Sequence, residues 1–209
     1  MAESYMSICT DRLFKVLVIG DVGVGKSSII LRYVKRDFSE NYKPSIGVDF
    51  ALKTVEWDPN TVVRLQFWDI AGQERFKKMS RVFYKAAMGA LVVFDITDSS
   101  SFEGASEWKR DLDSKVCLNS GCPIPAVLLA NKCDLAGQAR DLDKFCKDNS
   151  FLGWFETSAK DNINVEEAGA FLVKHMMRCD TDLSDEERHG DGIKVDQALG
   201  DGRRRPLCC

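Results

Sequence analysis

The eight residues from Gly20 to Ser27 constrain the fold of this chain more than any other part of its sequence. They read GDVGVGKS and follow an apolar run, residues 13–19, that has the length of a buried strand. Glycines let backbone N–H groups turn toward a polyphosphate, and a helix that begins after such a loop adds positive potential there. A glycine-rich turn without a ligand is the alternative, and the complete octet after an apolar strand makes it improbable. We expect Lys26 to reach the outer phosphates, Ser27 to bind Mg²⁺, and the following residues to border the phosphates: Val22, Gly23, Val24, Gly25 and Ser28.

Apolar runs alternate with helix-length segments along the chain. Residues 13–19, 90–96 and 125–130 are strand-like, and each is followed by a segment that can form a helix (residues 26–34, 102–115 and 142–149). This alternation predicts a parallel sheet with helices on both faces. Two further runs, residues 48–57 and 62–68, are joined by a turn-rich link, which predicts one hairpin and hence an antiparallel edge.

The chain of 209 residues, 44% of them hydrophobic, can bury one substantial core. A last helix is predicted over residues 165–178, because apolar residues recur there at helical spacing. The residues that follow contain few large apolar side chains and cannot recover their ordering entropy by burial. We therefore expect a flexible N-terminus at residues 1–12, one domain at residues 13–178 and a disordered tail at residues 179–209.

Composition excludes several classes of function. The formal charge is -3, and no basic run precedes the last seven residues, so we do not expect nucleic-acid binding. Residues 1–12 contain no apolar signal segment, and the longest apolar runs are too short to span a bilayer, so we expect neither secretion nor a membrane span. The eight cysteines include no CxxC pair, which argues against a metal finger.

A second motif begins at Asp69, at the end of the strand-like run 62–68. A carboxylate at the carboxyl end of a strand can hold Mg²⁺ through water, and Gly72 allows its N–H to approach a γ-phosphate. Gln73 could then orient the attacking water. Asp-x-x-Gly alone is a common turn, but its place some forty residues after the octet favours the metal interpretation.

Two tetrapeptides, NKCD at residues 131–134 and TSAK at residues 157–160, follow two more strand-like runs. An aspartate can accept hydrogen bonds from both the N1–H and the exocyclic amino group of guanine, whereas adenine offers no such donor pair. Asp134 therefore predicts GTP rather than ATP. A phosphate-loop ATPase or kinase is the rival that this residue argues against.

These motifs, in this order, resemble those of the Ras superfamily of small GTPases over residues 14–177. WDIAGQERF at residues 68–76 and YKPSIGVDF at residues 42–50 carry the likeness. The resemblance implies a P-loop NTPase G domain of α/β class, with a mostly parallel six-stranded sheet, one antiparallel edge strand and helices on both faces. It implies GTP/GDP and Mg²⁺ as cofactors, with Ser27, Ser45 and Asp69 at the metal and Gln73 and Lys26 in catalysis.

The same resemblance implies roles around the base. Asn131 ties the loops together, the Lys132 stem packs over the base, and the backbone N–H of Ala159 meets the guanine O6. Ser45 contacts the γ-phosphate only in the triphosphate state, so that hydrolysis releases its loop. The remaining nucleotide-binding residues by this resemblance are Phe38, Tyr42, Gly72, Ser158 and Lys160.

Within the superfamily the chain is most similar to Rab proteins, in particular to those of lysosome-related organelles and melanosome traffic. That likeness implies an effector surface formed by Ile46, Phe50, Trp68 and Phe83, although core packing could also explain the aromatic residues. It implies vesicle trafficking by a monomer on the cytoplasmic face of endosomal or lysosome-related membranes, with a cytosolic pool. Partners would be an exchange factor, a GTPase-activating protein, a GDP-dissociation inhibitor, Rab escort protein with geranylgeranyl transferase, and effectors.

The terminal pair Cys208 and Cys209 resembles the Rab site for two geranylgeranyl groups, which together give stable membrane attachment. Three departures from the Rab pattern bear on catalysis: Ser45 replaces Thr, Val22 replaces Gly, and Ile70 replaces Thr. We expect slow intrinsic hydrolysis that a partner protein accelerates. The alternative is a GTP-bound membrane scaffold with negligible hydrolysis, against which Gln73 argues.

Overall fold

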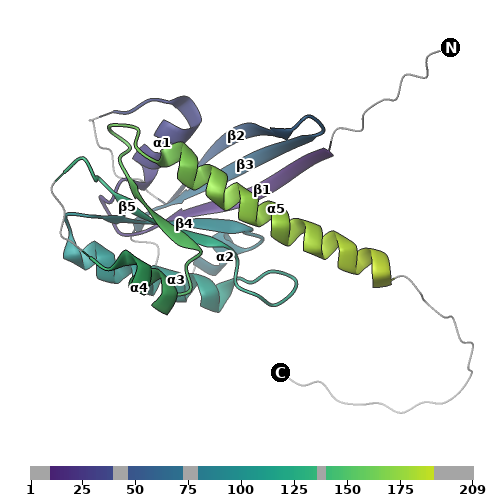
Figure 1. Cartoon of the computed structure of the whole chain (residues 1–209). Coiled ribbons are helices and arrows are strands. Elements are labelled where there is room, and N and C mark those ends of the chain that lie inside the picture. The colour runs from purple at the N-terminus through teal and green to yellow at the C-terminus, as the bar shows by residue number, and fades with distance from the viewer. Residues whose placement is uncertain (1–9, 40–46, 73–79, 136–139, 191–209) are drawn as a thin grey trace, which may run out of the picture.

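A single mixed sheet organises the protein (Figure 1). The computed structural model describes residues 10–39, 47–72, 80–135 and 140–190, and for Ser80 and residues 181–190 the backbone alone. The sheet has six strands in the order β2-β3-β1-β4-β5-β6. All neighbours run parallel except β2 and β3, which form the antiparallel pair at one edge. The predicted fold class is confirmed. The strands are β1 (Thr10–Ile19), β2 (Val48–Asp58), β3 (Thr61–Ile70), β4 (Gly89–Asp95), β5 (Ala126–Asn131) and β6 (Gly153–Thr157).

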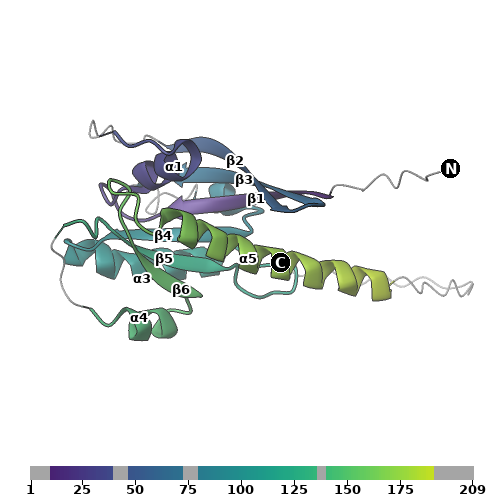
Figure 2. The ribbon, with the colours of Figure 1, turned by 45° about the horizontal axis from the view of Figure 1, so that its top comes forward.

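Helices cover both faces of the sheet (Figures 1 and 2). One core holds α1 and α5 against β1, β3, β4 and β5, and the other holds α3 and α4 on the opposite face. The central strands β4 and β5 are buried along their whole length, as expected of strands with helices on both sides. The helices are α1 (Lys26–Lys35), α2 (Ser80–Tyr84), α3 (Ser99–Lys115), α4 (Leu142–Asp148) and α5 (Val165–Gly190).

The first strand and the last helix are both longer than predicted. Strand β1 begins at Thr10, not at residue 13, because its polar first residues still pair with β3, and Asp11 lies 2.8 Å from Arg64 in an ion pair. Helix α5 ends at Gly190, not at residue 178. No proline or glycine interrupts the sequence between Gly169 and Gly190, so the acidic residues that predicted disorder are compatible with a helix.

Helix α5 extends past the end of the sheet in both views (Figures 1 and 2). Its polar extension begins where Arg12 and Asp180 form an ion pair of 3.0 Å. Among the helices that the structure describes, none combines the length and apolar character needed to cross a bilayer.

The parallel strands place their carboxyl ends along one edge of the sheet. The octet follows β1, NKCD overlaps the end of β5, and TSAK overlaps the end of β6. Asp69 pairs with Val18 near the end of β3. Loops at this edge of an open α/β sheet commonly form ligand sites, so the fold brings the predicted motifs together.

Candidate functional site

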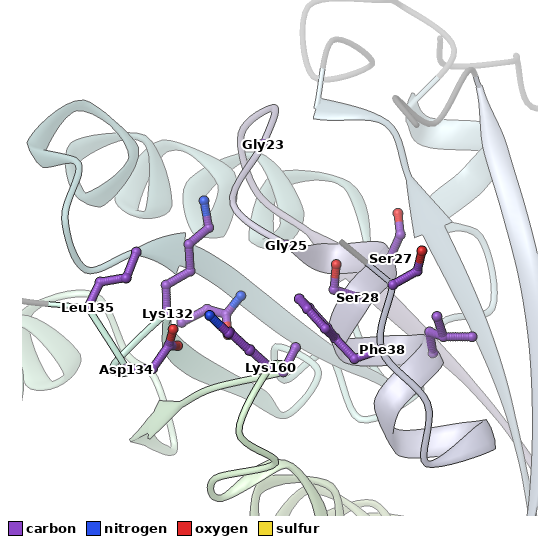
Figure 3. Close-up of a pocket in the computed structure, with 13 residues that line it drawn as sticks. Gly23, Gly25, Ser27, Ser28, Phe38, Lys132, Asp134, Leu135 and Lys160 are labelled. Atoms are coloured by element: carbon purple, nitrogen blue, oxygen red, sulfur yellow. The ribbon is translucent and has the colours of Figure 1, made fainter. Parts of the chain in front are cut away.

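A cavity of about 640 Å³ opens where these loops meet. Figure 3 shows Lys132 and Asp134 on one side of it and Ser27 on the other, with Phe38 and Lys160 between them. Most of the predicted nucleotide-binding residues line this cavity: Gly23, Gly25, Ser27, Ser28, Phe38, Asn131, Lys132, Asp134, Ala159 and Lys160. Leu31, Ser39 and Leu135 also line it and were not predicted.

The phosphate loop, residues 20–27, is curled around Lys26. The Lys26 ammonium donates hydrogen bonds to the carbonyls of Gly20 at 3.0 Å and Asp21 at 2.7 Å. Burial lowers the pKa of Lys26 to about 8, while the negative charges of Asp69 and Asp21 act in the opposite direction. A phosphate beside this ammonium would favour its charged form, so the geometry suits an anionic ligand.

Gly25 allows the phosphate loop to approach strand β5. Its φ of 99° lies in the left-handed region, and a Cβ there would lie 2.3 Å from Nδ2 of Asn131. The same Nδ2 donates to the carbonyl of Val24 at 2.8 Å. Asn131 therefore joins the phosphate loop to β5, as the resemblance implied. Any side chain at position 25 would disturb this contact.

Ser27 and Asp69 meet at the predicted metal position. The Ser27 hydroxyl donates a short hydrogen bond to Oδ2 of Asp69, whose carboxylate is buried. A hydroxyl and a carboxylate are oxygen ligands of the kind that Mg²⁺ prefers, and a buried carboxylate favours a compensating cation. The residues present therefore fit a magnesium ion, with Ser27 and Asp69 as those that would hold it.

Gly72 brings the end of β3 against the phosphate loop. A Cβ at this position would lie 2.4 Å from the backbone nitrogen of Val22 and 2.9 Å from its side chain. The Val22 side chain is 53% exposed and so lies at the surface of the loop, next to the glycine. The valine that replaces glycine in the phosphate loop is thus adjacent to the segment that leads to Gln73.

Side-chain contacts organise the base end of the cavity. The Ser158 hydroxyl donates to Oδ1 of Asp134 at 2.6 Å, which fixes the carboxylate predicted to read guanine. The Thr157 hydroxyl donates to Oδ1 of Asn131 at 3.4 Å, so side chains link the ends of β5 and β6 as well as the loops that follow them. Ser158 is completely buried and contributes through Asp134 instead of lining the cavity.

Lys132 is held by a residue that the sequence analysis missed. Its ammonium lies 2.6 Å from Oδ2 of Asp95 at the end of β4, and its φ is 66°. Burial alone would raise the pKa of Asp95, but hydrogen bonds from Lys132 and Thr97 outweigh it and hold that pKa below its ordinary value of 3.8. A polar residue at a strand end near the motifs is the signal that could have identified Asp95.

Trp108 is a second missed residue. It is completely buried on α3, and its indole Nε1 donates to Oδ1 of Asp21 at 2.8 Å. Gly104 makes room for this contact, because a Cβ there would lie 2.2 Å from Oδ2 of Asp21. The interior of α3 thus supports the first turn of the phosphate loop. A glycine inside a helix is the signal that marks such a close approach.

Some predicted residues lie elsewhere or outside the described residues. The Val24 side chain is buried in the core, and its carbonyl accepts the bond from Asn131. Ile70 is also fully buried. Tyr42, Ser45, Ile46, Gln73, Cys208 and Cys209 fall outside the described residues.

The aromatic residues predicted to form an effector surface differ in burial. Phe50 is 56% exposed and packs edge-on against Trp68, with ring centroids 4.5 Å apart. The Lys15 ammonium lies 3.4 Å from the centre of the Trp68 ring. Trp68 and Phe83 are partly buried and also pack against the core beneath. Phe50 is therefore the member most available to a partner.

Comparison with known proteins agrees with this geometry. The model of the Ras family matches residues 15–178. Human Ras-related protein Rab-32 is 57% identical over 203 residues, which cover 95% of this chain and 90% of that protein. Dictyostelium discoideum Ras-related protein Rab-32A is 53% identical, with 94% and 93% covered, and human Ras-related protein Rab-7L1 is 50% identical, with 88% and 93% covered. The chain therefore belongs to the Rab group of the Ras family and is a GTPase that binds guanine nucleotide.

Proposed function

We propose that this GTPase is a slowly hydrolysing switch of intracellular vesicle traffic that recruits effectors in its GTP state. The observation that carries the proposal is one cavity lined by Ser27 at one end and by Asp134 at the other. Lys26 is buried within the phosphate loop at the first end, and Asp69 is bonded there to Ser27. An exchange factor loads GTP, and a GTPase-activating protein resets the switch. The GDP-dissociation inhibitor, the escort protein and the geranylgeranyl transferase serve its membrane cycle.

Each end of the cavity has a distinct task in this scheme. Asp134, fixed by Ser158, accepts hydrogen bonds from guanine, and the Lys132 stem covers the base. Lys26 neutralises charge on the outer phosphates. Mg²⁺, held by Ser27 and Asp69 and in the triphosphate state also by Ser45, would neutralise charge that develops on the phosphate oxygens. Gln73 orients the water.

Slow hydrolysis follows from the crowding at Val22. Its bulk beside Gly72 opposes the placement of Gln73 and water near the γ-phosphate. In a single-turnover assay we expect Val22→Gly to hydrolyse GTP about ten-fold faster than the wild type, which corresponds to about 1.4 kcal/mol of barrier. Leu152→Gly, at an exposed apolar residue outside the cavity, is the control for loss of a side chain. Fast unaided hydrolysis by the wild type would reject this part of the proposal.

The alternative function is a GTP-bound membrane scaffold with negligible hydrolysis, which Val22 and Ser45 favour. Phosphate release in the presence of a GTPase-activating protein distinguishes the two. A switch responds with acceleration of several orders of magnitude. A scaffold shows no release above background, with or without that protein.

Effector recruitment is assigned to Phe50 with Trp68, Phe83 and Ile46. We expect the wild type loaded with a non-hydrolysable GTP analogue to retain partners that the GDP-loaded protein does not. Phe50→Ala should lose this difference, because the exposed ring leaves the surface while the buried core stays. Leu152→Ala, which removes a comparably exposed apolar side chain, should keep it. Equal capture by both variants would contradict the assignment.

Membrane attachment is assigned to geranylgeranyl groups on Cys208 and Cys209. By the resemblance to Rab proteins, we place the protein on the cytoplasmic face of endosomal or lysosome-related membranes, with a cytosolic pool. Mass spectrometry of the membrane fraction from the native host tests this. Both thiols unmodified in that fraction would refute the attachment by lipid.

A further inference from the structure

Arg32 links helix α1 to the loop that follows β6. Its Nε donates to the carbonyl of Ala159 at 2.7 Å, and one terminal nitrogen donates to the carbonyl of Lys160 at 2.9 Å. The other terminal nitrogen donates to the carbonyl of Arg36 at 2.9 Å, near the end of α1. The guanidinium is thus anchored to its own helix while it holds two successive carbonyls of another segment.

The same guanidinium lies next to a second wall of the cavity. Its central carbon is 5.9 Å from the centre of the Phe38 ring. Phe38, Ala159 and Lys160 line the cavity, whereas Arg32 does not. Figure 3 shows Phe38 and Lys160 there. Arg32 therefore lies against residues from two walls of the cavity without lining the cavity itself.

The loop is closed on itself as well as held by Arg32. Ser158 and Ile163 exchange backbone hydrogen bonds of 3.2 and 3.0 Å, and the N–H of Asp161 donates to the Ser158 hydroxyl at 3.0 Å. These bonds fix the internal shape of the loop. The bonds from Arg32 fix its position relative to α1, and hence relative to the phosphate loop from which α1 begins.

We propose that Arg32 is a positioning residue for guanine recognition, which holds the Ala159–Lys160 segment so that the N–H of Ala159 points at the guanine O6. The inference rests on the proposed function, together with the contact between this N–H and O6 that the resemblance to the Ras superfamily implies. The N–H of Ala159 shares a rigid peptide plane with the Ser158 carbonyl, which accepts from the Ile163 N–H at 3.0 Å. Arg32 holds the next two peptide planes through the carbonyls of Ala159 and Lys160, so both sides of the Ala159 Cα are fixed. A guanidinium presents donors in one rigid plane to both carbonyls, whereas a lysine ammonium is a compact charge on a flexible stem with rotatable donors.

The test compares three ligands in each variant: GDP, 6-thio-GDP and inosine diphosphate. Sulfur at position 6 weakens the acceptor that Ala159 reads, and inosine lacks the amino group that Asp134 reads. For Arg32→Met we expect about ten-fold weaker GDP binding, the loss of a charged hydrogen-bond donor. We define the penalty for each analogue as the ratio of its dissociation constant to that of GDP in the same variant. In Arg32→Met we expect the penalty for sulfur to shrink toward one, while the penalty for inosine persists.

Arg32→Lys serves as the second variant. It retains the charge but lacks the rigid planar fork that holds the two carbonyls, so the sulfur penalty should shrink by a smaller factor than in Arg32→Met. Arg12→Met, which removes an arginine paired with Asp180 far from the cavity, should leave both penalties at the wild-type value. Because each penalty is a ratio within one variant, a general loss of stability cancels.

A uniform loss of affinity for all three ligands in both Arg32 variants would overturn the inference, because a merely structural arginine has that effect. Failure of the proposed function has a different signature. In that case the wild type itself shows no preference for GDP over inosine diphosphate. The two failures are thus distinguished by the wild-type measurement alone.

Discussion

The phosphate end and the base end of the cavity are built in different ways. The phosphate end consists mainly of one continuous stretch, residues 20–27, shaped by glycine backbone angles and by main-chain carbonyls around Lys26, and Asp69 joins it from β3. The base end combines segments after β4, β5 and β6 with α1, and side-chain hydrogen bonds hold these segments together. The first is encoded locally and the second through tertiary contacts. Substitutions should therefore affect the two ends by different mechanisms.

The largest effect is expected where the two ends touch, at Gly25→Ala. The new Cβ strains a left-handed residue and collides with Asn131, so the variant loses both backbone geometry and a buried hydrogen bond. We expect GDP binding to fall roughly 1000-fold by calorimetry, from about 4 kcal/mol of combined cost. Gly121→Ala has a similar φ of 82° with open space around it, and should leave the affinity unchanged. Binding within ten-fold of the wild type would show that the ends are independent.

Asp134→Asn changes the base end and leaves the phosphate end intact. An amide cannot accept both guanine donors, but its NH₂ can donate to the 2-carbonyl of xanthine. We expect about 100-fold weaker GDP binding and a matching gain for xanthosine diphosphate, measured by competition. Asp148→Asn, at an exposed position in α4, is the control. An unchanged preference for GDP would remove the base end from its assigned role.

Asp95→Asn tests whether a residue that only holds Lys132 in place affects the base end. Without the ion pair, Lys132 is less well fixed, and we expect GDP release to accelerate about five-fold, the upper range for a partly exposed pair. Release is measured with a fluorescent GDP. The conservative Asp95→Glu should lie between the variant and the wild type. Equal release rates in all three proteins would contradict a role for the pair.

The same variant gives a pH dependence. Because the folded-state pKa of Asp95 lies below its ordinary value of 3.8, the ionised group stabilises the folded state above that value. The contribution is lost as the pH falls through the folded-state pKa. The unfolding free energy of the wild type should thus exceed that of Asp95→Asn at neutral pH and approach it below pH 3.8. A difference in unfolding free energy that grows on acidification would have the opposite sign and would refute this prediction.

The smallest effect is expected at Trp108→Phe, which removes a distant support of the phosphate end. Losing the bond to Asp21 costs about 1 kcal/mol and should speed GDP release about three-fold. Trp154→Phe is a matched control, because its Nε1 also donates to an aspartate, Asp143, at 2.8 Å. Both variants lose stability in thermal unfolding, but only Trp108→Phe should change release. Equal release would assign Trp108 to the fold alone.

The local encoding of the phosphate end explains why the sequence predicted it. Its octet and the alternation of strands and helices are patterns within short windows. Arg32 and Trp108 act on partners 127 and 87 residues away, which no window contains. Gly104 offered a local sign of the second contact. Arg32 offered none, because an arginine in the last turn of a helix is expected there on electrostatic grounds.

The bounds of β1 and α5 were mispredicted for a different reason, because local composition was given too much weight. Residues 10–12 lack apolar side chains, yet they join the sheet because β3 offers them a partner strand. The extension of α5 is polar, yet its residues are all permitted in a helix. Composition predicts where the residues that form the hydrophobic core end along the chain. It does not predict where a hydrogen-bonded strand or helix ends.

The contact between Gly25 and Asn131 also limits how this protein can change over generations. A side chain at position 25 would require a shorter residue at position 131 and would still be strained at a φ of 99°. The shorter residue would also give up the bond to Val24. We therefore expect position 25 to remain glycine among descendants that still bind nucleotide, even where position 131 varies.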